Sequence, residues 1–109
     1  MLYYREKIIL SILEEFGSLG KTQMQKYLFL FTRLQQEPSY DFIPYNYGCF
    51  SFQANQDLMT LATYGYIVLN DNYYSLQKTE QSYLAQLDIF DQQYISDIYG
   101  DRGLGIGDW

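Results

Sequence analysis

The sequence has no histidine and only one cysteine, Cys49, among its 109 residues. Without histidine there is no Ser-His or Cys-His catalytic pair and no Cys/His zinc site. A single cysteine cannot form an internal disulfide, and a free thiol suits a reducing compartment, so we expect a cytoplasmic protein. Neither a calcium-loop spacing nor a phosphate-binding glycine loop is present, and we therefore expect no metal and no cofactor.

Positive charge is also scarce. Seven Lys and Arg stand against 13 Asp and Glu, and the formal net charge is −6. Residues 1–50 hold five of the cations and five of the acids, so the negative excess belongs to residues 51–109. Because nucleic acids and anionic membranes are both bound mainly through Lys and Arg, the charge disfavours either partner. No apolar run reaches the about 18 residues of a membrane span.

Aromatic residues are abundant instead: the chain has 13 Tyr and seven Phe, and 48% of its residues are hydrophobic. This composition is typical of a globular protein, and the length suits one domain. We expect that domain to span residues 1–100. Glycine recurs along residues 101–109, and we expect them to form a flexible tail or the start of a removed C-terminal region.

Apolar residues spaced three and four apart predict three helices. The first covers residues 2–16. The second covers residues 22–34, where Thr22 and Gln25 can form a capping box, and it is so apolar that we expect it to be the buried centre of the domain. The third helix covers residues 51–64 and is capped by Ser51.

A β-ribbon is expected after the third helix, because residues 66–69 and 73–76 are strand-like. Asn70-Asp71-Asn72 between them tolerates the left-handed angles of a tight turn. Helix, turn, helix and ribbon in this order predict an α+β fold, mostly α. The predicted fold is a winged helix-turn-helix with three or more helices, a two-strand β-ribbon wing and a C-terminal helical region.

The C-terminal helical region is expected over residues 79–99, with Thr79 as its cap, a break near Asp88 and a stop at Gly100. Phe90 belongs to the apolar set that we expect to face the core. Carboxylates are plentiful here and elsewhere, but none has a spacing that implies a catalytic cleft. We therefore expect no enzymatic activity.

Residues 40–52 are crowded with aromatic side chains: Tyr40, Phe42, Tyr45, Tyr47, Phe50 and Phe52. We expect residues 41–48 to be extended or looped, because Pro44 cannot occupy a central strand. One interpretation of the aromatic residues is a lid over the core, which is the commoner case. The other is an exposed patch that binds a partner. The contact residues would then be Tyr45, Tyr47, Phe50 and Phe52.

A DNA-binding version of this fold would insert the third helix into the major groove. The residues available for contact are Lys21, Lys26, Arg33, Gln53, Asn55 and Gln56. Gln and Asn are able to read adenine edges. However, the only charge on the third helix is Asp57, and residues that read bases without phosphate anchors have little affinity.

The segment Met24-Gln25-Lys26-Tyr27-Leu28-Phe29-Leu30-Phe31 resembles the Leu-Gln-Lys-Leu-Leu-Tyr-Phe core helix of the Panacea (SocA-like) domain family. Further counterparts are residues 47–49, 58–61, 65–67 and 74–76, although Cys49 stands where the family has proline. The chain is also similar to the N-terminal winged-helix segment of uncharacterised bacterial proteins. The resemblance implies a winged helix that acts in toxin–antitoxin or phage-defence systems by binding a protein.

The sequence thus predicts a non-catalytic bacterial winged-helix module for protein interaction. Its partner would be another protein, of unknown identity, or a second copy of the chain. The alternative is a DNA-binding transcriptional regulator of the winged helix-turn-helix type, which the charge disfavours.

Overall fold

The structure, a computed structural model, describes residues 2–45 and 48–101. Within them lie four α-helices: α1 (Tyr4–Phe16), α2 (Lys21–Leu34), α3 (Phe52–Thr63) and α4 (Ile89–Asp101). The short strands are β1 (Leu19–Gly20), β2 (Ile43–Tyr45), β3 (Gly48–Phe50), β4 (Ile67–Asn70) and β5 (Tyr73–Leu76), and η1 (Leu84–Gln86) is a 3₁₀ turn. The predicted class, α+β and mostly α, is confirmed.

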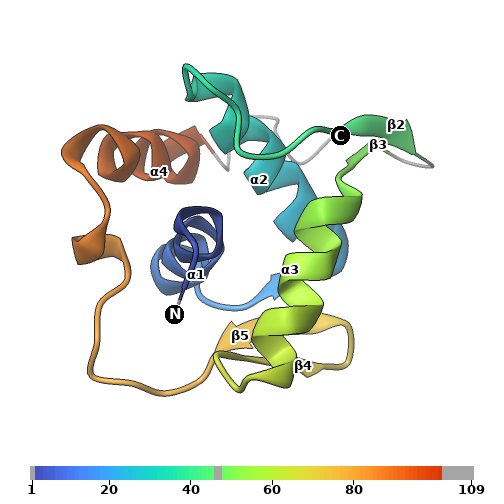
Figure 1. The fold of residues 1–109 in the computed structure, drawn as a ribbon, viewed down its shortest axis with the longest axis vertical. Coiled ribbons are helices and arrows are strands. Elements are labelled where there is room, and N and C mark those ends of the chain that lie inside the picture. Colours follow the sequence, from blue (N-terminus) through green and yellow to red (C-terminus); the bar gives the residue numbers. More distant parts are fainter. Residues whose placement is uncertain (1, 46–47, 102–109) are drawn as a thin grey trace.

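Helix α1 lies at the centre, with the other helices and the strands around it (Figure 1). Residues 8–13 of α1 are at most 1% exposed, and a helix buried on every side forms the core of a domain. The prediction that residues 22–34 form the centre is therefore wrong. α2 buries Met24, Leu28 and Phe31 on one side, whereas Leu34 is 41% exposed.

Strands β1, β5 and β4 form one antiparallel sheet in that order. The β4–β5 pair is the predicted ribbon, and its register places Asn70 opposite Tyr73. Asp71 and Asn72 form the loop, with φ angles of 52° and 68°, as a type I′ hairpin turn requires. On the other side of β5, Leu19 pairs with Tyr74 and so joins the sheet to the end of α1.

Residues 43–45 and 48–50 pair as a second antiparallel ribbon, β2–β3, and the expectation of an extended or looped segment did not include this pairing. Pro44 lies opposite Cys49 in its register. Both strands of a two-strand ribbon are edges, and alternate N–H groups of an edge strand point away from the partner strand, where proline is tolerated.

Gln25 and Ser51 connect α2 to the beginning of α3. The Gln25 side chain accepts a hydrogen bond from the Ser51 N–H at 2.8 Å and donates one to the Ser51 carbonyl at 3.3 Å. The predicted Thr22–Gln25 capping box is therefore wrong. Ser51 caps α3 as predicted, because its hydroxyl accepts from the Ala54 N–H at 3.1 Å.

Residues 77–83 are irregular, so the predicted cap at Thr79 is wrong. Glu14 of α1 holds this segment in place. Its carboxylate accepts from the Ser82 hydroxyl at 2.7 Å and from the N–H groups of Tyr83 and Leu84 at 2.8 and 3.2 Å.

Two further expectations for the C-terminal region are also wrong. α4 continues through Gly100 to Asp101, and Phe90 is 68% exposed instead of facing the core. The rest of the predicted tail, residues 102–109, lies outside the described residues. Along the described chain, no helix has the length and the apolar character that crossing a membrane requires.

Candidate protein-contact surface

Three aromatic side chains meet where the β2–β3 ribbon joins α3. The ring centroids of Tyr45 and Phe50 lie 5.2 Å apart, and those of Phe50 and Phe52 lie 4.9 Å apart. Tyr45 and Phe52 are separated by 6.1 Å. These separations fall within the roughly 4.5–7 Å of favourable aromatic pairs. The three rings therefore restrict one another, and we refer to them as the aromatic triad.

Burial divides the aromatic residues of positions 40–52 into two groups. Tyr40 is 3% exposed, and Phe42 packs against the core with its ring 5.4 Å from that of Phe29. These two residues form the predicted lid. In the triad, by contrast, Tyr45 is 48% exposed and Phe52 is 61% exposed, so this part is an exposed patch. Tyr47 lies outside the described residues.

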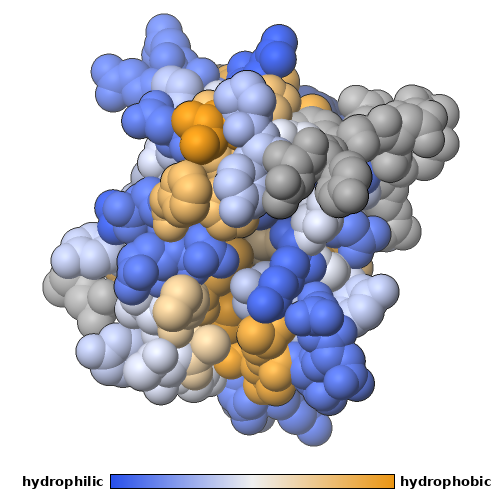
Figure 2. Space-filling view, turned by 90° about the vertical axis from the view of Figure 1, so that its right-hand side faces the viewer, coloured by the Kyte–Doolittle hydropathy of each residue, from blue (hydrophilic) through white to orange (hydrophobic). Residues whose placement is uncertain are grey.

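The segment that carries the triad has almost no exposed charge. Between Asp41 and Asp71 the sequence contains one charged residue, Asp57, and Asp57 is 3% exposed. Large apolar side chains from this stretch are exposed: Ile43, Tyr45, Phe52, Met59, Tyr64, Val68 and Leu69. The aromatic triad and Met59, which lies seven residues after Phe52 and therefore on the same face of the helix, form what we call the α3 surface. Figure 2 views the side of the molecule on which α3 and the β2–β3 ribbon lie, and apolar areas there are bordered by hydrophilic ones.

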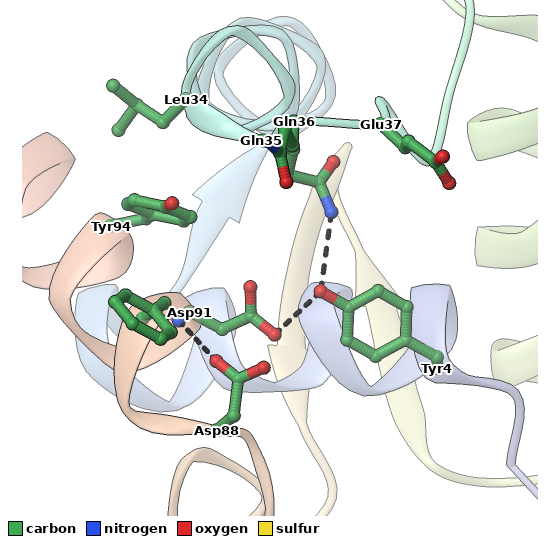
Figure 3. A pocket seen from close by; sticks show the side chains of 9 residues that line it. Tyr4, Leu34, Gln35, Gln36, Glu37, Asp88, Asp91 and Tyr94 are labelled. Carbon is green, nitrogen blue, oxygen red and sulfur yellow. Dashed lines mark hydrogen bonds between the residues drawn. The ribbon is translucent and has the colours of Figure 1, made fainter.

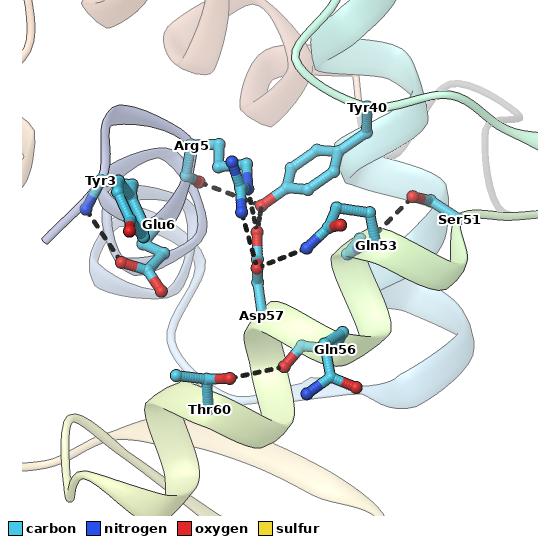
Figure 4. Close-up of polar contacts among 10 residues, drawn as sticks. Tyr3, Arg5, Glu6, Tyr40, Ser51, Gln53, Gln56, Asp57 and Thr60 are labelled. Carbon is cyan, nitrogen blue, oxygen red and sulfur yellow. Dashed lines mark hydrogen bonds and ion pairs between the residues drawn. The ribbon is translucent and has the colours of Figure 1, made fainter.

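Asp57 is turned into the protein, where three side chains donate to it (Figure 4). Arg5 Nε lies 2.6 Å from Oδ2, and Arg5 Nη2 lies 3.4 Å from Oδ1. The Tyr40 hydroxyl donates to Oδ2 at 2.6 Å, and the Gln53 amide donates to Oδ1 at 2.9 Å. The carboxylate thus ties α1 and the segment before β2 to α3, one helical turn beyond Phe52.

The Tyr40 hydroxyl is held in its neutral, donating form. Burial raises the pKa of Tyr40 above its ordinary value, and the hydrogen bond to Asp57 raises it further. Both effects act because a phenolate would be poorly solvated and would face a carboxylate. The neutral hydroxyl therefore donates to Asp57, with the Arg5 carbonyl oxygen 3.3 Å away as a second acceptor.

The cations expected to contact DNA do not gather on one surface. Lys26 is 5% exposed, with its Nζ 5.0 Å from the centre of the Tyr27 ring. Lys21 and Arg33 are both exposed, but they lie at opposite ends of α2, about 18 Å apart at 1.5 Å per residue. Arg33 lies over the ring of Phe29 at 5.6 Å.

The amides expected to read bases differ in their surroundings. Gln53 already donates to Asp57, and the Asn55 amide lies 3.9 Å from the sulfur of Met59. Gln56 is exposed. The described part of α3 thus offers no cation beside these amides to bind a phosphate.

Within the described residues, no group of three His, Cys, Asp or Glu side chains is arranged to hold a metal ion. Cys49 is half-buried in β3. The chemistry that the α3 surface offers is therefore apolar contact with a few amide and hydroxyl groups, as in the central part of many protein interfaces.

No protein-family model matches the chain, and no curated protein or solved structure shows significant similarity to it. The resemblance of residues 24–31 to the Panacea core helix stays a prediction.

Sequence reasoning identified the triad residues but missed the Asp57 cluster. The sequence does contain one indication of this cluster: Asp57 is the only charged residue in a long uncharged stretch. An ionised side chain on an otherwise uncharged helix either serves solubility or has a buried partner, and the pattern alone does not distinguish the two.

Replacing Arg5 with Met should destabilise the protein strongly, since it leaves the buried Asp57 carboxylate with only neutral donors. We expect a loss of about 2–4 kcal/mol, below the full effect of breaking a buried pair because Arg5 is partly exposed. Urea unfolding of the variant and the wild type measures this loss in the free energy of unfolding. The matched control is Arg33→Met, which removes an exposed Arg and should lose at most about 1 kcal/mol. Equal losses in the two variants would contradict the role assigned to the Arg5–Asp57 pair.

Replacing Tyr40 with Phe should change both the stability and its pH dependence. At neutral pH we expect a loss of about 1–3 kcal/mol, because a hydrogen bond to a buried charge is removed. The folded-state pKa of Tyr40 is raised from 10.0, so its contribution is complete below pH 10 and is lost as the pH rises beyond that value. The difference between wild type and Y40F should shrink in urea unfolding above pH 10. A constant difference would show that Tyr40 does not titrate in this way.

Proposed function

We propose that this chain is a non-catalytic winged-helix module that binds another protein through the α3 surface. The observation that carries the proposal is the combination of three clustered, exposed aromatic rings with an absence of exposed charge from Phe42 to Asn70 in the described part. The centres of protein interfaces are depleted of charged residues and enriched in aromatic residues and Met. Buried aromatic anchors there also contribute most of the binding energy.

The connectivity supports the winged-helix assignment. α2 and α3 take the places of the helix-turn-helix, the β4–β5 ribbon takes the place of the wing, and β1 completes a three-stranded sheet with it. The fold differs from the usual helix-turn-helix in the connection between α2 and α3, where a turn of three or four residues is usual. Here residues 35–51 intervene and include the β2–β3 ribbon, so the triad lies at the entrance to the helix that would otherwise contact DNA.

The size of the triad sets a requirement for the interface. A large aromatic residue buries about 150–250 Å², and these rings are only partly exposed, so the triad supplies a few hundred Å² at most. A stable interface buries about 800 Å² per partner. The partner must therefore extend beyond the triad, over Met59 on the same face of α3 and over the neighbouring surface.

The partner's chemistry follows from this surface. We propose a protein with a complementary apolar and uncharged face, and the resemblance to the Panacea family suggests a toxin or a phage-defence component as that protein. A DNA duplex is a poor alternative, because it needs cations along its phosphates and those of α2 are dispersed or buried. A second copy of the chain is the other protein partner that the surface could accept.

The test compares two exposed apolar residues that each begin a helix. Phe52→Ser, at the start of α3, should abolish capture of the partner from the native host's lysate, because it removes a central ring of the triad. Ile89→Ser, at the start of α4 and 76% exposed, should leave capture unchanged. Unfolding measurements on both variants establish that they remain folded. Capture that survives Phe52→Ser, or is lost equally in both variants, contradicts the proposal.

Sedimentation of the purified chain over a wide range of concentrations separates the two kinds of protein partner. We expect a monomer, since the proposed partner is a different protein. A dimer that Phe52→Ser dissociates and Ile89→Ser does not would instead assign the α3 surface to self-association.

A gel-shift assay tests the DNA-binding alternative. We expect no retardation of duplex DNA at roughly 50 mM salt, where phosphate contacts are strongest. Retardation that is weakened by Lys21→Ala or Arg33→Ala would overturn the proposed function in favour of a DNA-binding regulator.

A further inference from the structure

An acidic cavity lies where the N-terminal turns of α1 and α4 approach the end of α2. Its volume is about 650 Å³. Its lining includes the carboxylates of Glu37, Asp88 and Asp91 and the aromatic rings of Tyr4, Phe90 and Tyr94, but no Lys or Arg. The cavity shares no residue with the α3 surface, so whatever it binds is additional to the contact proposed above.

Asp91 is the central polar group of this cavity and is 4% exposed. Its Oδ2 accepts a hydrogen bond from the Tyr4 hydroxyl at 2.6 Å, and Gln35 donates to that hydroxyl at 3.3 Å. Within the described residues, no hydrogen bond or ion pair is made to Asp91 Oδ1. Figure 3 shows this second oxygen pointing away from the Tyr4 hydroxyl and towards the side of the cavity where Gln35 and Gln36 lie.

Asp91 Oδ1 keeps some contact with solvent, so it is open to a ligand that enters the cavity. Burial raises the pKa of Asp91, and the nearby Asp88 raises it further, while the hydrogen bond from Tyr4 lowers it. The one donor does not fully compensate the burial of Asp91. A cation in the cavity would supply what is missing.

The charge of Asp88 is already used in the fold. Asp88 Oδ1 accepts from the Asp91 N–H at 2.8 Å, so it caps the first turn of α4 and offsets the partial positive charge of that helix end. Asp91 and the exposed Glu37 then remain as the negative charge that a ligand would meet. The net charge of −6 adds a long-range attraction for cations.

The apolar walls favour a cation with a hydrocarbon stem over a bare metal ion. Figure 3 shows the Asp91 carboxylate between the side chains of Tyr4 and Tyr94. Leu34 and Phe90, 41% and 68% exposed, add apolar surface to the lining. Aromatic faces attract ammonium and guanidinium groups, and an alkyl stem packs on apolar side chains while its charged end reaches a carboxylate. The described acids are not arranged to hold a metal ion.

We propose that this cavity receives a lysine or arginine side chain of a partner protein. The cationic end binds the free oxygen of Asp91 beside the Tyr94 ring, and the alkyl stem lies along Leu34 and Phe90. Glu37, on the rim, attracts the cation as it enters. The four residues in contact come from the end of α2 and the first two turns of α4.

The experiment titrates the full chain with small probes and follows its backbone amide signals by NMR at constant ionic strength. N-acetyl-lysine methylamide and N-acetyl-arginine methylamide should shift the signals of Gln35, Asp91 and Tyr94 in a saturable way. The norleucine analogue, which lacks the charge, should not. Asp91→Asn should weaken binding of the cationic probes about tenfold or more, because the charge-assisted contact is lost, whereas the amide oxygen still accepts from Tyr4.

Asp71→Asn is the matched control. It removes the same charge from an exposed turn where Asn tolerates the positive φ, and it should leave the affinity within about twofold, since separated surface charges are screened. Glu37→Gln, which cannot disturb the core, should weaken binding a few-fold. The proposal fails if Asp91→Asn binds as well as wild type, if Asp71→Asn weakens binding as much, or if the norleucine analogue binds equally.

Two further measurements identify the source of the cation and test whether the cavity binds independently of the α3 surface. If butylamine binds while the blocked lysine and arginine do not, the ligand is a small amine and the assignment to a protein side chain is wrong. Phe52→Ser should leave binding of the blocked lysine unchanged. Loss of cation binding in Phe52→Ser would overturn the separation of the two sites, whereas failure of the cation titration alone leaves the α3 proposal standing.

Discussion

The buried charge of Asp57 is the constraint on which the arrangement of α1, α3 and the segment before β2 depends. An ionised carboxylate inside a protein is tolerated only when donors surround it. Here the donors come from three places: Arg5 on α1, Tyr40 before the ribbon and Gln53 on α3 itself. Because each donor must reach one carboxylate, the position of α3 against α1 is restricted, and the triad at its first turn is restricted with it.

The inward direction of Asp57 also determines the character of the α3 surface. If this side chain pointed outward, the helix would carry a negative charge in the middle of its exposed face and would repel apolar partners through the cost of desolvating that charge. Since it points inward, the stretch from Phe42 to Asn70 presents amides, hydroxyls and aromatic rings without a net charge. The same contact therefore fixes the fold and leaves an apolar surface exposed.

The parts of this fold that could be predicted from sequence are those with local causes. Apolar spacing located α1, α2 and α3 to within two residues at each end, and Asn70-Asp71-Asn72 predicted a tight turn because its side chains tolerate positive φ. The failures involve partners distant in sequence. Gln25 was assigned to a local cap but bonds Ser51, and Thr79 was expected to begin a helix in a segment that Glu14 of α1 holds in an irregular conformation. The chemistry of the contact residues was visible in the sequence, whereas their exposure and the burial of Asp57 were not.

The acidic cavity likewise could not be predicted from sequence, because it is formed by contacts between segments that are distant along the chain. Leu34 and Phe90 each fit the apolar pattern of their segments, and on that pattern both were expected to face the core. They are exposed because Gln35 ends α2 at the place where α4 begins, and the Tyr4–Asp91 hydrogen bond fastens that junction to α1. Apolar residues left exposed at this junction do not contribute the stability that their burial would bring. The uncharged α3 surface and this acidic cavity thus favour ligands of different chemistry. A single protein with an apolar face and a basic side chain would fit both.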